Sequence, residues 1–446
     1  MAGSNLQLTT AHEVPVLIRF RELAVDGSRR GVGVSDRPTR SFQSSIIVLD
    51  FRSLIFLVDP INMAWGQAAA ASCSRLLDRL EAGQVQELTI RSGWTEHDAM
   101  RLGQLLQDGV FVTAVRASGK PITIEGLRAI GRGVGVNRHL QHLSIGSPTS
   151  GDEGLLALLE GFTTTTTLSS LDWSYKDAST VSLAAILRCR SITYINLSRN
   201  PRMEPIRLDD DVSQHVVFEL DLSDCNVSDA SITALTARLQ PQVVRLSHNP
   251  LTKLPCLPSV KELYLSHCQI ESLEGLTALE SLQVLDLSHN RLSDASMLVP
   301  TDTLRILNLA GNPIADTLPL QQSLFESLDL SQTGCSPAYA SRATAHVSHE
   351  LRLFDNRLGA AGVMALEFSS SSPLQSLDLA GNQCDEETLV ALLQRLQNEP
   401  ILPQLKTLIV GGNQGGPKLE EAVAELKRVR PELDVARDKK KQQTAL

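Results

Sequence analysis

Apolar residues recur along the chain in a fixed order of nine positions. The clearest copy is LQVLDLSHN at residues 282–290, and close copies are LRILNLAGN at 304–312, LQSLDLAGN at 374–382 and VFELDLSDC at 217–225. Positions one, four and six are apolar, whereas positions three, five, seven and eight are mostly polar. This alternation predicts a short strand that turns its apolar side chains inward. The ninth residue, Asn or Cys, is predicted to turn the chain and hydrogen-bond the backbone of neighbouring coils.

Fourteen candidate copies of this pattern follow one another. They begin at residues 85, 112, 140, 168, 192, 217, 241, 260, 282, 304, 325, 348, 374 and 405. The copy at 241, PQVVRLSHN, is degenerate. A single unit cannot bury its apolar face, so the units are expected to stack. The pattern therefore predicts an α/β solenoid in the form of a horseshoe, with a parallel β-sheet on the concave face and helices or 3₁₀ turns on the convex face.

The spacing of the units changes along the chain. The first four begin 27 or 28 residues apart, those between 241 and 325 begin 19 to 22 residues apart, and the last two intervals are 26 and 31 residues. A long unit has room for a convex helix, whereas a short unit has room only for a 3₁₀ turn or an extended segment. We therefore expect strong curvature at both ends and a flatter middle, from about residue 250 to 345.

Apolar residues at intervals of three and four predict convex helices within the longer units. The predicted helices include residues 126–132, 154–161, 231–239 and 387–396, and Asp229 and Asp385 are predicted to cap the last two. The tract GRGVG at 131–135 follows a helix and precedes a strand, which is the wrong order for a dinucleotide fingerprint. It is therefore interpreted as a helix-to-strand connector.

The nine-residue pattern resembles the leucine-rich repeat. The long units, with passages such as VNRHLQHLSI at 136–145, are similar to the ribonuclease-inhibitor type, and the short middle units resemble the intracellular repeats of phosphatase-regulator and dynein-light-chain relatives. The resemblance covers roughly residues 64–437. It implies a repeat solenoid with a C-terminal cap at 426–435, and it implies no particular partner.

The two ends of the chain differ from the repeats. The segment 46–58 is apolar but contains Asp50 and Arg52 and is too short to cross a bilayer, so a pair of strands or a capping element is expected there. No signal peptide is visible near Met1. We expect a partly disordered N-terminal extension at 1–63, a solenoid at 64–437 that begins with a capping helix near 68–80, and a charged tail at 438–446.

Composition narrows the class of partner. The net charge of −9 argues against broad phosphate binding, so no nucleic-acid partner is expected. Seven scattered cysteines without zinc-ligand spacing favour a reducing, cytoplasmic compartment. No metal, cofactor or catalytic group is predicted. Aspartates at the fifth position follow the repeat consensus, and on an open sheet they are expected to lie in no desolvated pocket.

The candidate binding residues lie at the variable outward positions. His248, His267 and His289 occupy the eighth position of three successive units and are expected to form a ladder at one edge of the concave face. Arg245 and Arg352 interrupt an acidic stripe and are expected to pair with neighbouring acids. Exposed tyrosines are scarce, and tyrosine is a frequent interface anchor. The predicted protein-binding residues are Tyr175, Tyr194, Glu219, Arg245, His248, Glu262, Tyr264, His267, Asp286, His289, Asp329 and Arg352.

The leading hypothesis is a non-enzymatic, monomeric scaffold that binds a protein through its concave face, in a cytoskeletal, centrosomal, axonemal or phosphatase-regulatory setting. The alternative is a regulator similar to the Ran GTPase-activating protein, although the basic tail here differs from the acidic tail of that family. A ligand sensor of the innate-immune type is disfavoured, because the roughly 60 residues before the repeats are too few for a nucleotide-binding domain.

Overall fold

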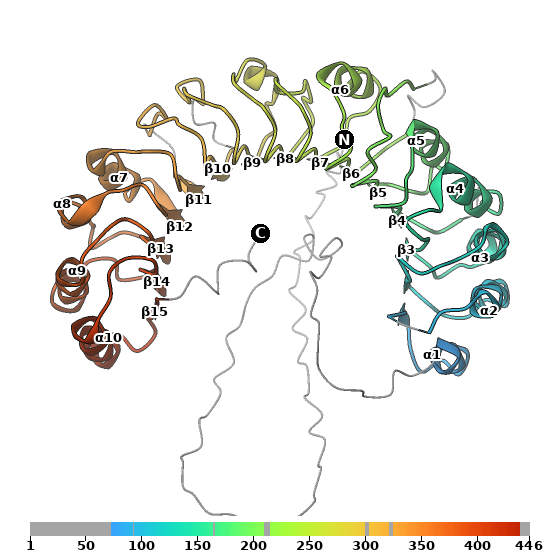
Figure 1. Ribbon diagram of the computed structural model, residues 1–446, viewed down its shortest axis with the longest axis horizontal. Helices are drawn as coiled ribbons and strands as arrows, with labels where there is room; N and C mark the ends of the chain where they lie inside the picture. The colour runs from blue at the N-terminus through green and yellow to red at the C-terminus, as the bar shows by residue number, and fades with distance from the viewer. Residues whose placement is uncertain are drawn as a thin grey trace, which may run out of the picture. The chain divides into compact units, whose positions relative to one another are not determined.

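The computed structural model describes residues 73–91, 93–163, 166–208, 215–298, 303–320 and 324–437. These residues contain one parallel sheet of 15 strands, which follow one another in sequence order. Figure 1 shows the strands on the inner side of an arc and the helices on its outer side. The predicted α/β solenoid is therefore confirmed. The predicted N-terminal extension, 1–63, and the tail, 438–446, lie outside the described residues.

Most strands are three residues long and cover positions three to five of the repeat. Their bounds are β1 Glu87–Thr89, β2 Ala114–Arg116, β3 His142–Ser144, β4 Ser170–Asp172, β5 Tyr194–Asn196, β6 Glu219–Asp221, β7 Val243–Arg245, β8 Glu262–Tyr264, β9 Val284–Asp286, β10 Ile306–Asn308, β11 Phe325–Asp329, β12 Val347–Arg352, β13 Ser376–Asp378, β14 Thr407–Ile409 and β15 Asp434–Ala436. Third positions pair with third positions, as Glu262 does with Val284. All fourteen predicted units form strands in the predicted register.

A fifteenth strand lies at the predicted C-terminal cap. The segment 426–435 contains the end of α10, Pro417–Val429, then a turn and the start of β15, Asp434–Ala436, which pairs with β14. Backbone N–H and C=O groups at the edge of a parallel sheet need partners, and a further strand supplies them to β14.

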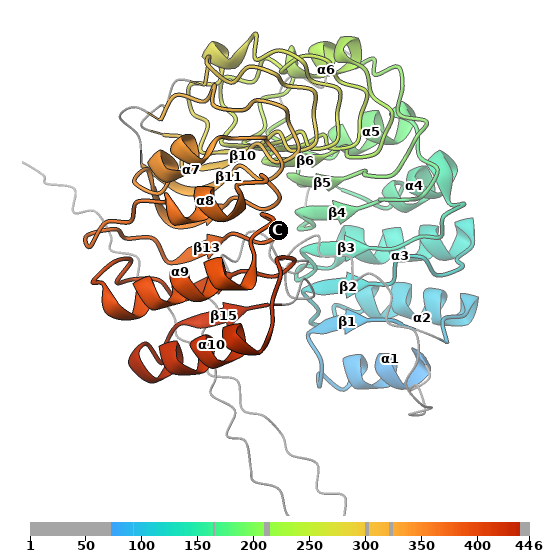
Figure 2. The same cartoon turned by 60° about the vertical axis from the view of Figure 1, so that its left-hand side comes forward.

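Helices cover the convex side of both arms of the arc. They are α1 Cys73–Glu81, α2 Glu96–Gln107, α3 Ile124–Val136, α4 Gly151–Leu159, α5 Thr180–Leu187, α6 Asp229–Thr236, α7 Pro337–Ala343, α8 Gly359–Met364, α9 Glu386–Asn398 and α10 Pro417–Val429. Figure 2 shows α1 to α4 and α8 to α10 stacked in the layer outside their strands. No helix among the described residues is long and apolar enough to span a membrane.

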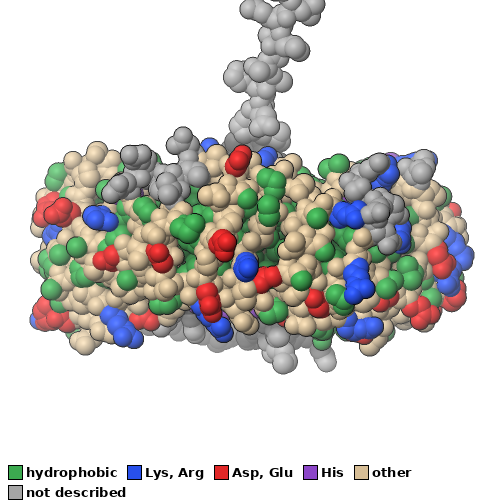
Figure 3. Space-filling view, turned by 90° about the horizontal axis from the view of Figure 1, so that it is seen from above, with side chains coloured by type: hydrophobic (Ala, Val, Ile, Leu, Met, Phe, Trp, Pro, Cys, Tyr) green, Lys and Arg blue, Asp and Glu red, His purple; other side chains and the backbone are tan. Residues whose placement is uncertain are grey.

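The middle of the convex side carries little regular structure. Between α6 and α7, the described residues contain one 3₁₀ helix, η2 Leu276–Ala278. This confirms that the short units lack α-helices, whereas the difference in curvature stays a prediction. Figure 3 shows hydrophobic, acidic and basic side chains intermixed on the convex side.

One of the two predicted helix caps is correct. Asp385 precedes α9, and its carboxylate accepts the N–H of Thr388 at 2.8 Å. The prediction for Asp229 is wrong, because Ser228 is the N-cap of α6 and Asp229 is its first residue. The Asp229 carboxylate instead accepts the hydroxyl of Thr252 in the next unit.

Glycines allow the first convex helices to pack closely. The tract 131–135 lies within α3, so its interpretation as a helix-to-strand connector is wrong. A Cβ atom at Gly131 would lie 2.0 Å from the carbonyl oxygen of Leu158 in α4, and one at Gly133 would lie 2.5 Å from that of Gly103 in α2. The backbones of three successive helices therefore approach to distances that only glycine permits.

We predict that Gly131→Ala lowers the free energy of unfolding by about 3 kcal/mol, because the added methyl group must displace the α4 backbone. Gly415→Ala is the matched control, since a Cβ atom there meets only the Leu419 side chain at 3.4 Å. Urea unfolding followed by circular dichroism measures both variants. Equal, small losses would show that the α3–α4 contact is adjustable.

Buried asparagines at the ninth position join each unit to its neighbours. The Asn290 amide donates to the carbonyls of Leu265, in the preceding unit, and Leu287 at 2.8 and 2.9 Å, and its oxygen accepts the N–H of Ile270 at 3.0 Å. A bond to the preceding unit recurs at Asn200, Asn249, Asn312, Asn356, Asn382 and Asn413. Where the residue is Cys225, its thiol donates to Leu197 at 3.1 Å. The predicted role of the ninth position is confirmed.

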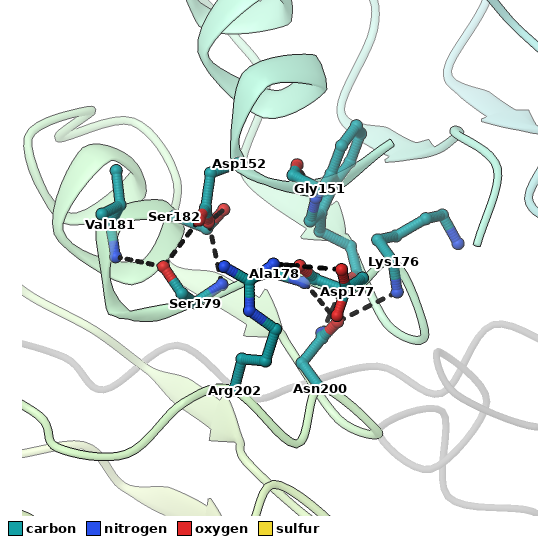
Figure 4. Close-up of polar contacts among 11 residues, drawn as sticks. Gly151, Asp152, Lys176, Asp177, Ala178, Ser179, Val181, Ser182, Asn200 and Arg202 are labelled. Atoms are coloured by element: carbon teal, nitrogen blue, oxygen red, sulfur yellow. Dashed lines mark hydrogen bonds and ion pairs between the residues drawn. The ribbon is translucent and has the colours of Figure 1, made fainter. Parts of the chain in front are cut away.

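Lys176 occupies a ninth position in place of Asn. Its side chain is buried, and its ammonium donates to the Ser118 hydroxyl, two units away, and to the Ser174 carbonyl, both at 2.7 Å. Burial lowers the pKa of this lysine. Its backbone N–H donates to the Asn200 side chain, so the asparagine of the next unit still bonds this unit (Figure 4).

Carboxylates near the starts of the convex helices form a second set of hydrogen bonds between successive units, in addition to the asparagine bonds. Asp152 at the start of α4 accepts the N–H and hydroxyl of Ser179 at 2.8 and 2.6 Å and the hydroxyl of Ser182 at 2.6 Å (Figure 4). Ser179 in turn caps α5 by accepting the N–H of Val181. Burial alone would raise the pKa of Asp152, but these hydrogen bonds outweigh it and lower the pKa. Similar pairs are Glu96–Thr123, Glu204–Ser228 and Asp316–Ser336.

We predict that Asp152→Ala lowers the free energy of unfolding by about 2–3 kcal/mol at pH 7, because three donors lose a charged acceptor. Glu153→Ala, an exposed neighbour in α4, is the control. Since the pKa of Asp152 is lowered in the folded state, its contribution is lost as pH falls through that pKa. In urea melts at decreasing pH, the free energies of unfolding of the two variants should therefore converge. A difference between them that persists at low pH would contradict this account.

Candidate protein-binding site on the concave face

In about half of the units, the fifth position of the repeat closes a turn after the strand. In seven units an Asp or Asn there accepts the backbone N–H of the seventh residue, at distances from 2.8 Å for Asp378 to 3.1 Å for Asn308. The other five are Asp172, Asn196, Asp221, Asp286 and Asp329. This Asx turn gives the consensus residue a structural role at the edge of the concave face.

Several of these carboxylates are desolvated, so the expectation that they lie in no desolvated pocket is wrong. Asp221, Asp329 and Asp378 are all buried. Burial raises the pKa of each of them, and that of Asp378 reaches about 6. The physical reason is crowding, because strands about 4.8 Å apart on the inner side of a curve place fifth-position side chains against one another.

We predict that Asp378→Asn raises the free energy of unfolding at pH 7.5 by about 1–2 kcal/mol. Asparagine fits, since Asn196 and Asn308 make the same turn bond. The folded-state pKa of about 6 lies above the unfolded value, so the charged form destabilises the fold above pH 6 and this penalty disappears as pH falls. The gain should thus vanish near pH 4.

The half-buried Asp286 provides the control, because Asp286→Asn keeps the turn bond to Ser288 and removes a less buried charge. Urea melts at pH 7.5 and 4 should show a smaller effect for this variant. If Asp378→Asn destabilises the protein at pH 7.5, the favourable interactions of the Asp378 charge exceed the desolvation penalty of burying it.

Arg245 organises the middle of the concave face. Its guanidinium bonds the buried Glu219 at 3.0 Å and lies over the ring of Tyr264 at 4.1 Å. The Tyr264 hydroxyl donates to Glu262 at 3.1 Å. Burial raises the pKa of Glu219, and the charge of Arg245 only partly offsets it. The predicted pairing of this arginine with neighbouring acids is confirmed.

We use the name central patch for the polar and aromatic residues on β5 to β9. Its members are Tyr194, Glu219, Asp221, Arg245, Glu262, Tyr264 and Asp286. The Tyr194 ring lies against that of Phe218, with centroids 5.1 Å apart. Four carboxylates and one guanidinium give the patch a formal charge of −3.

A second acidic group lies further along the sheet, on β11 to β13. Arg352 lies 3.1 Å from Glu350 and 3.6 Å from Asp329, which confirms its predicted pairing. Asp378 is the third carboxylate beside it. Three acids and one arginine leave a formal charge of −2. The two acidic groups are interrupted by the uncharged Asn308 on β10.

The eighth position forms a rim at the end of the strands. Its residues have the left-handed backbone, with φ of 55° at Tyr175, 61° at His248, 53° at His267 and 55° at His289. The three imidazoles stack, with centroids 4.6 and 4.3 Å apart, so the predicted ladder is confirmed. Tyr175 is 62% exposed at the same rim, in the unit that contains β4. The described residues contain no group of three or more ligands suited to a metal ion.

The structure brings nine of the twelve predicted binding residues together on β5 to β9 and the adjoining rim. Asp329 and Arg352 belong to the second acidic group, and Tyr175 stands apart. Burial of Glu219 and Asp329 means that they shape the surface more than they offer contact area. Asp221, Glu350 and Asp378 were not predicted as site residues, although their acidic side chains at outward positions were the available signal.

Comparison with known families agrees with this architecture. The model "Leucine Rich repeats (2 copies)" matches residues 258–300, and the model "Leucine Rich repeat" matches residues 303–317. Together with 15 parallel strands in the repeat register, these matches make the chain a leucine-rich-repeat protein. No match to a curated protein is found.

Solved structures with a similar fold are distant in sequence. An internalin from Listeria monocytogenes is 16% identical over 81% of this chain and 88% of that chain, with a TM-score of 0.39. A chain of the mouse RP105/MD-1 complex is 18% identical over 79% and 71%, with a TM-score of 0.44. A chain of the yeast Rad7 and Elc1 complex is 14% identical over 84% and 88%, with a TM-score of 0.37.

Proposed function

We propose that this protein is a scaffold whose concave face binds a basic segment of another protein. The observation that carries the proposal is the central patch, where half-exposed aromatic rings lie among more carboxylates than cations. Leucine-rich repeats present such inner surfaces to partners because stacked units leave a long concave sheet.

Charge decides which kind of partner fits. The central patch has a formal charge of −3 and the second acidic group −2, and both lie on the same face. A basic segment that runs along the sheet meets both groups, and complementary charge steers encounter and suppresses acidic competitors. Tyr194 and Tyr264 supply flat contact area that loses little entropy on binding.

The cysteines support a reducing compartment as the place of action. All seven lack a disulfide partner, and burial raises the pKa of the Cys225 thiol to about 12 and of the Cys268 thiol to about 11. Such thiols stay protonated and inert at neutral pH. We propose a cytoplasmic location on this ground, with a cytoskeletal setting as one environment rich in basic protein segments.

Binding of deca-lysine and deca-glutamate peptides, each labelled with rhodamine, tests the choice of partner. Fluorescence anisotropy at low salt should show binding of deca-lysine alone. Glu262→Gln/Asp286→Asn should weaken it about ten-fold, because two half-exposed carboxylates of the central patch are lost.

The matched control is Glu421→Gln/Glu425→Gln on the exposed side of α10, which changes the net charge equally. It should bind deca-lysine like the wild type. Equal weakening by the control would show that only net charge matters and that the concave assignment is wrong. Preference for deca-glutamate would overturn the proposed sign of the partner's charge.

A further inference from the structure

The histidine stack is fixed in place by the backbone. The backbone φ is left-handed at His248, His267 and His289. The backbone N–H of each histidine donates to a backbone carbonyl in the next unit, at 2.8, 2.9 and 2.6 Å respectively. The rings lie nearly parallel, at interplanar angles of 8° and 14°. At the far end, a Cβ atom on Gly311 would come within 2.5 Å of the His289 ring, so glycine there makes room for it. The imidazoles cannot separate without a change in rotamer or in the backbone of their units.

The stack lies beside the central patch. Its residues follow β7, β8 and β9, whose fifth positions are Arg245, Tyr264 and Asp286. The eighth position comes three residues after the fifth, a path of about 10 Å, which is close to the Debye length at physiological salt. A charge gained at the stack therefore acts on a partner bound to the patch.

Few charges surround the stack. Asp286 interacts with His267 and favours its protonation, whereas the two other imidazoles and burial oppose it. Along the rim, Asp224 and Arg199 are the charged residues at the eighth positions of the two preceding units, and Gly311 and Gln332 on the other side are uncharged. Burial, together with the two neighbouring imidazoles, lowers the pKa of His267.

We propose that the histidine stack makes binding at the concave face sensitive to pH, so that acidification releases a basic partner. This inference rests on the proposed function. Three protons would bring the combined formal charge of the central patch and stack from −3 to 0, which removes the attraction for a cationic segment. Because neighbouring imidazolium charges 4–5 Å apart repel one another, protonation of one ring opposes protonation of the next.

Binding of rhodamine-labelled deca-lysine at pH 7.5, 6.5 and 5.5 and constant ionic strength tests this inference. Lysine side chains keep their charge throughout this range. The wild type should bind about ten-fold more weakly at pH 5.5 than at pH 7.5. The triple variant His248→Gln/His267→Gln/His289→Gln should change less than about two-fold over the same range. Glutamine fits the rim, since Gln332 has the same left-handed backbone with φ of 55°.

The matched control is His97→Gln/His139→Gln/His349→Gln, which removes three histidines that lie away from the stack. It should keep the full ten-fold pH effect. If the stack variant keeps it too, the concave carboxylates cause the effect and the inference is wrong. If the wild type binds deca-lysine equally at all three pH values, the inference fails and the proposed function stands. If no deca-lysine binds even at pH 7.5, the basic-partner proposal fails and takes this inference with it.

A second measurement follows the stack directly. Carbon-resolved NMR of the imidazole Cε1–H groups, assigned from the single His→Gln variants, should show His267 titrating below about pH 6.5, the unperturbed value. The three curves should be broad and depend on one another, so that each single variant shifts the remaining two. Three independent curves at the unperturbed value would show that the rings do not act as a unit.

Discussion

The fold depends on how the backbone groups at the turn after each strand are satisfied. Each unit leaves carbonyl and N–H groups there that lie too deep for water, and an unpaired buried group costs about 1–3 kcal/mol. The ninth-position asparagine bonds the carbonyls of its own unit and of the preceding one, as Asn290 does with Leu287 and Leu265. Burial of the apolar core drives the units to stack, and the asparagine hydrogen bonds set the distance and register between them.

That fixed distance produces the chemistry of the concave face. The fifth-position aspartates accept the hydrogen bond that closes the turn. Because stacking places these side chains close together, Asp221, Asp329 and Asp378 are buried. Arg245 and Arg352 each sit among several carboxylates and offset only part of their charge. The same geometry aligns the eighth-position imidazoles. An acidic, partly aromatic inner surface beside a titratable rim is thus a consequence of repeat stacking combined with a few variable residues.

On the convex side, the main constraint is the packing of neighbouring helices. Where units are long, helices must pass one another, and the glycines of α3 remove the side chains that would keep α2 and α4 apart. Carboxylates such as Asp152 then tie each helix start to the next. In the described part of the short units, α-helices are absent and the return segments carry little regular structure. Stability is therefore distributed along the solenoid in neighbour-to-neighbour contacts, as expected for a repeat protein.

The sequence by itself determined the repeat, its fourteen strands and their register, because strand alternation and unit length are local properties that one motif records. It also placed the histidine ladder, since residues at equal positions of adjacent units are neighbours. It placed the pairing of Arg245 as well, because the third and fifth positions of adjacent strands lie diagonally across from each other. The sequence could not show that Ser228 rather than Asp229 caps α6, because Asp229 is engaged by Thr252 of another unit.

Only the tertiary structure decided which outward carboxylates lose their water and why the tract 131–135 is rich in glycine. Both depend on the distance between elements that are far apart in sequence. Desolvation and steric contact act through space, and the nine-residue pattern describes each strand without its neighbours.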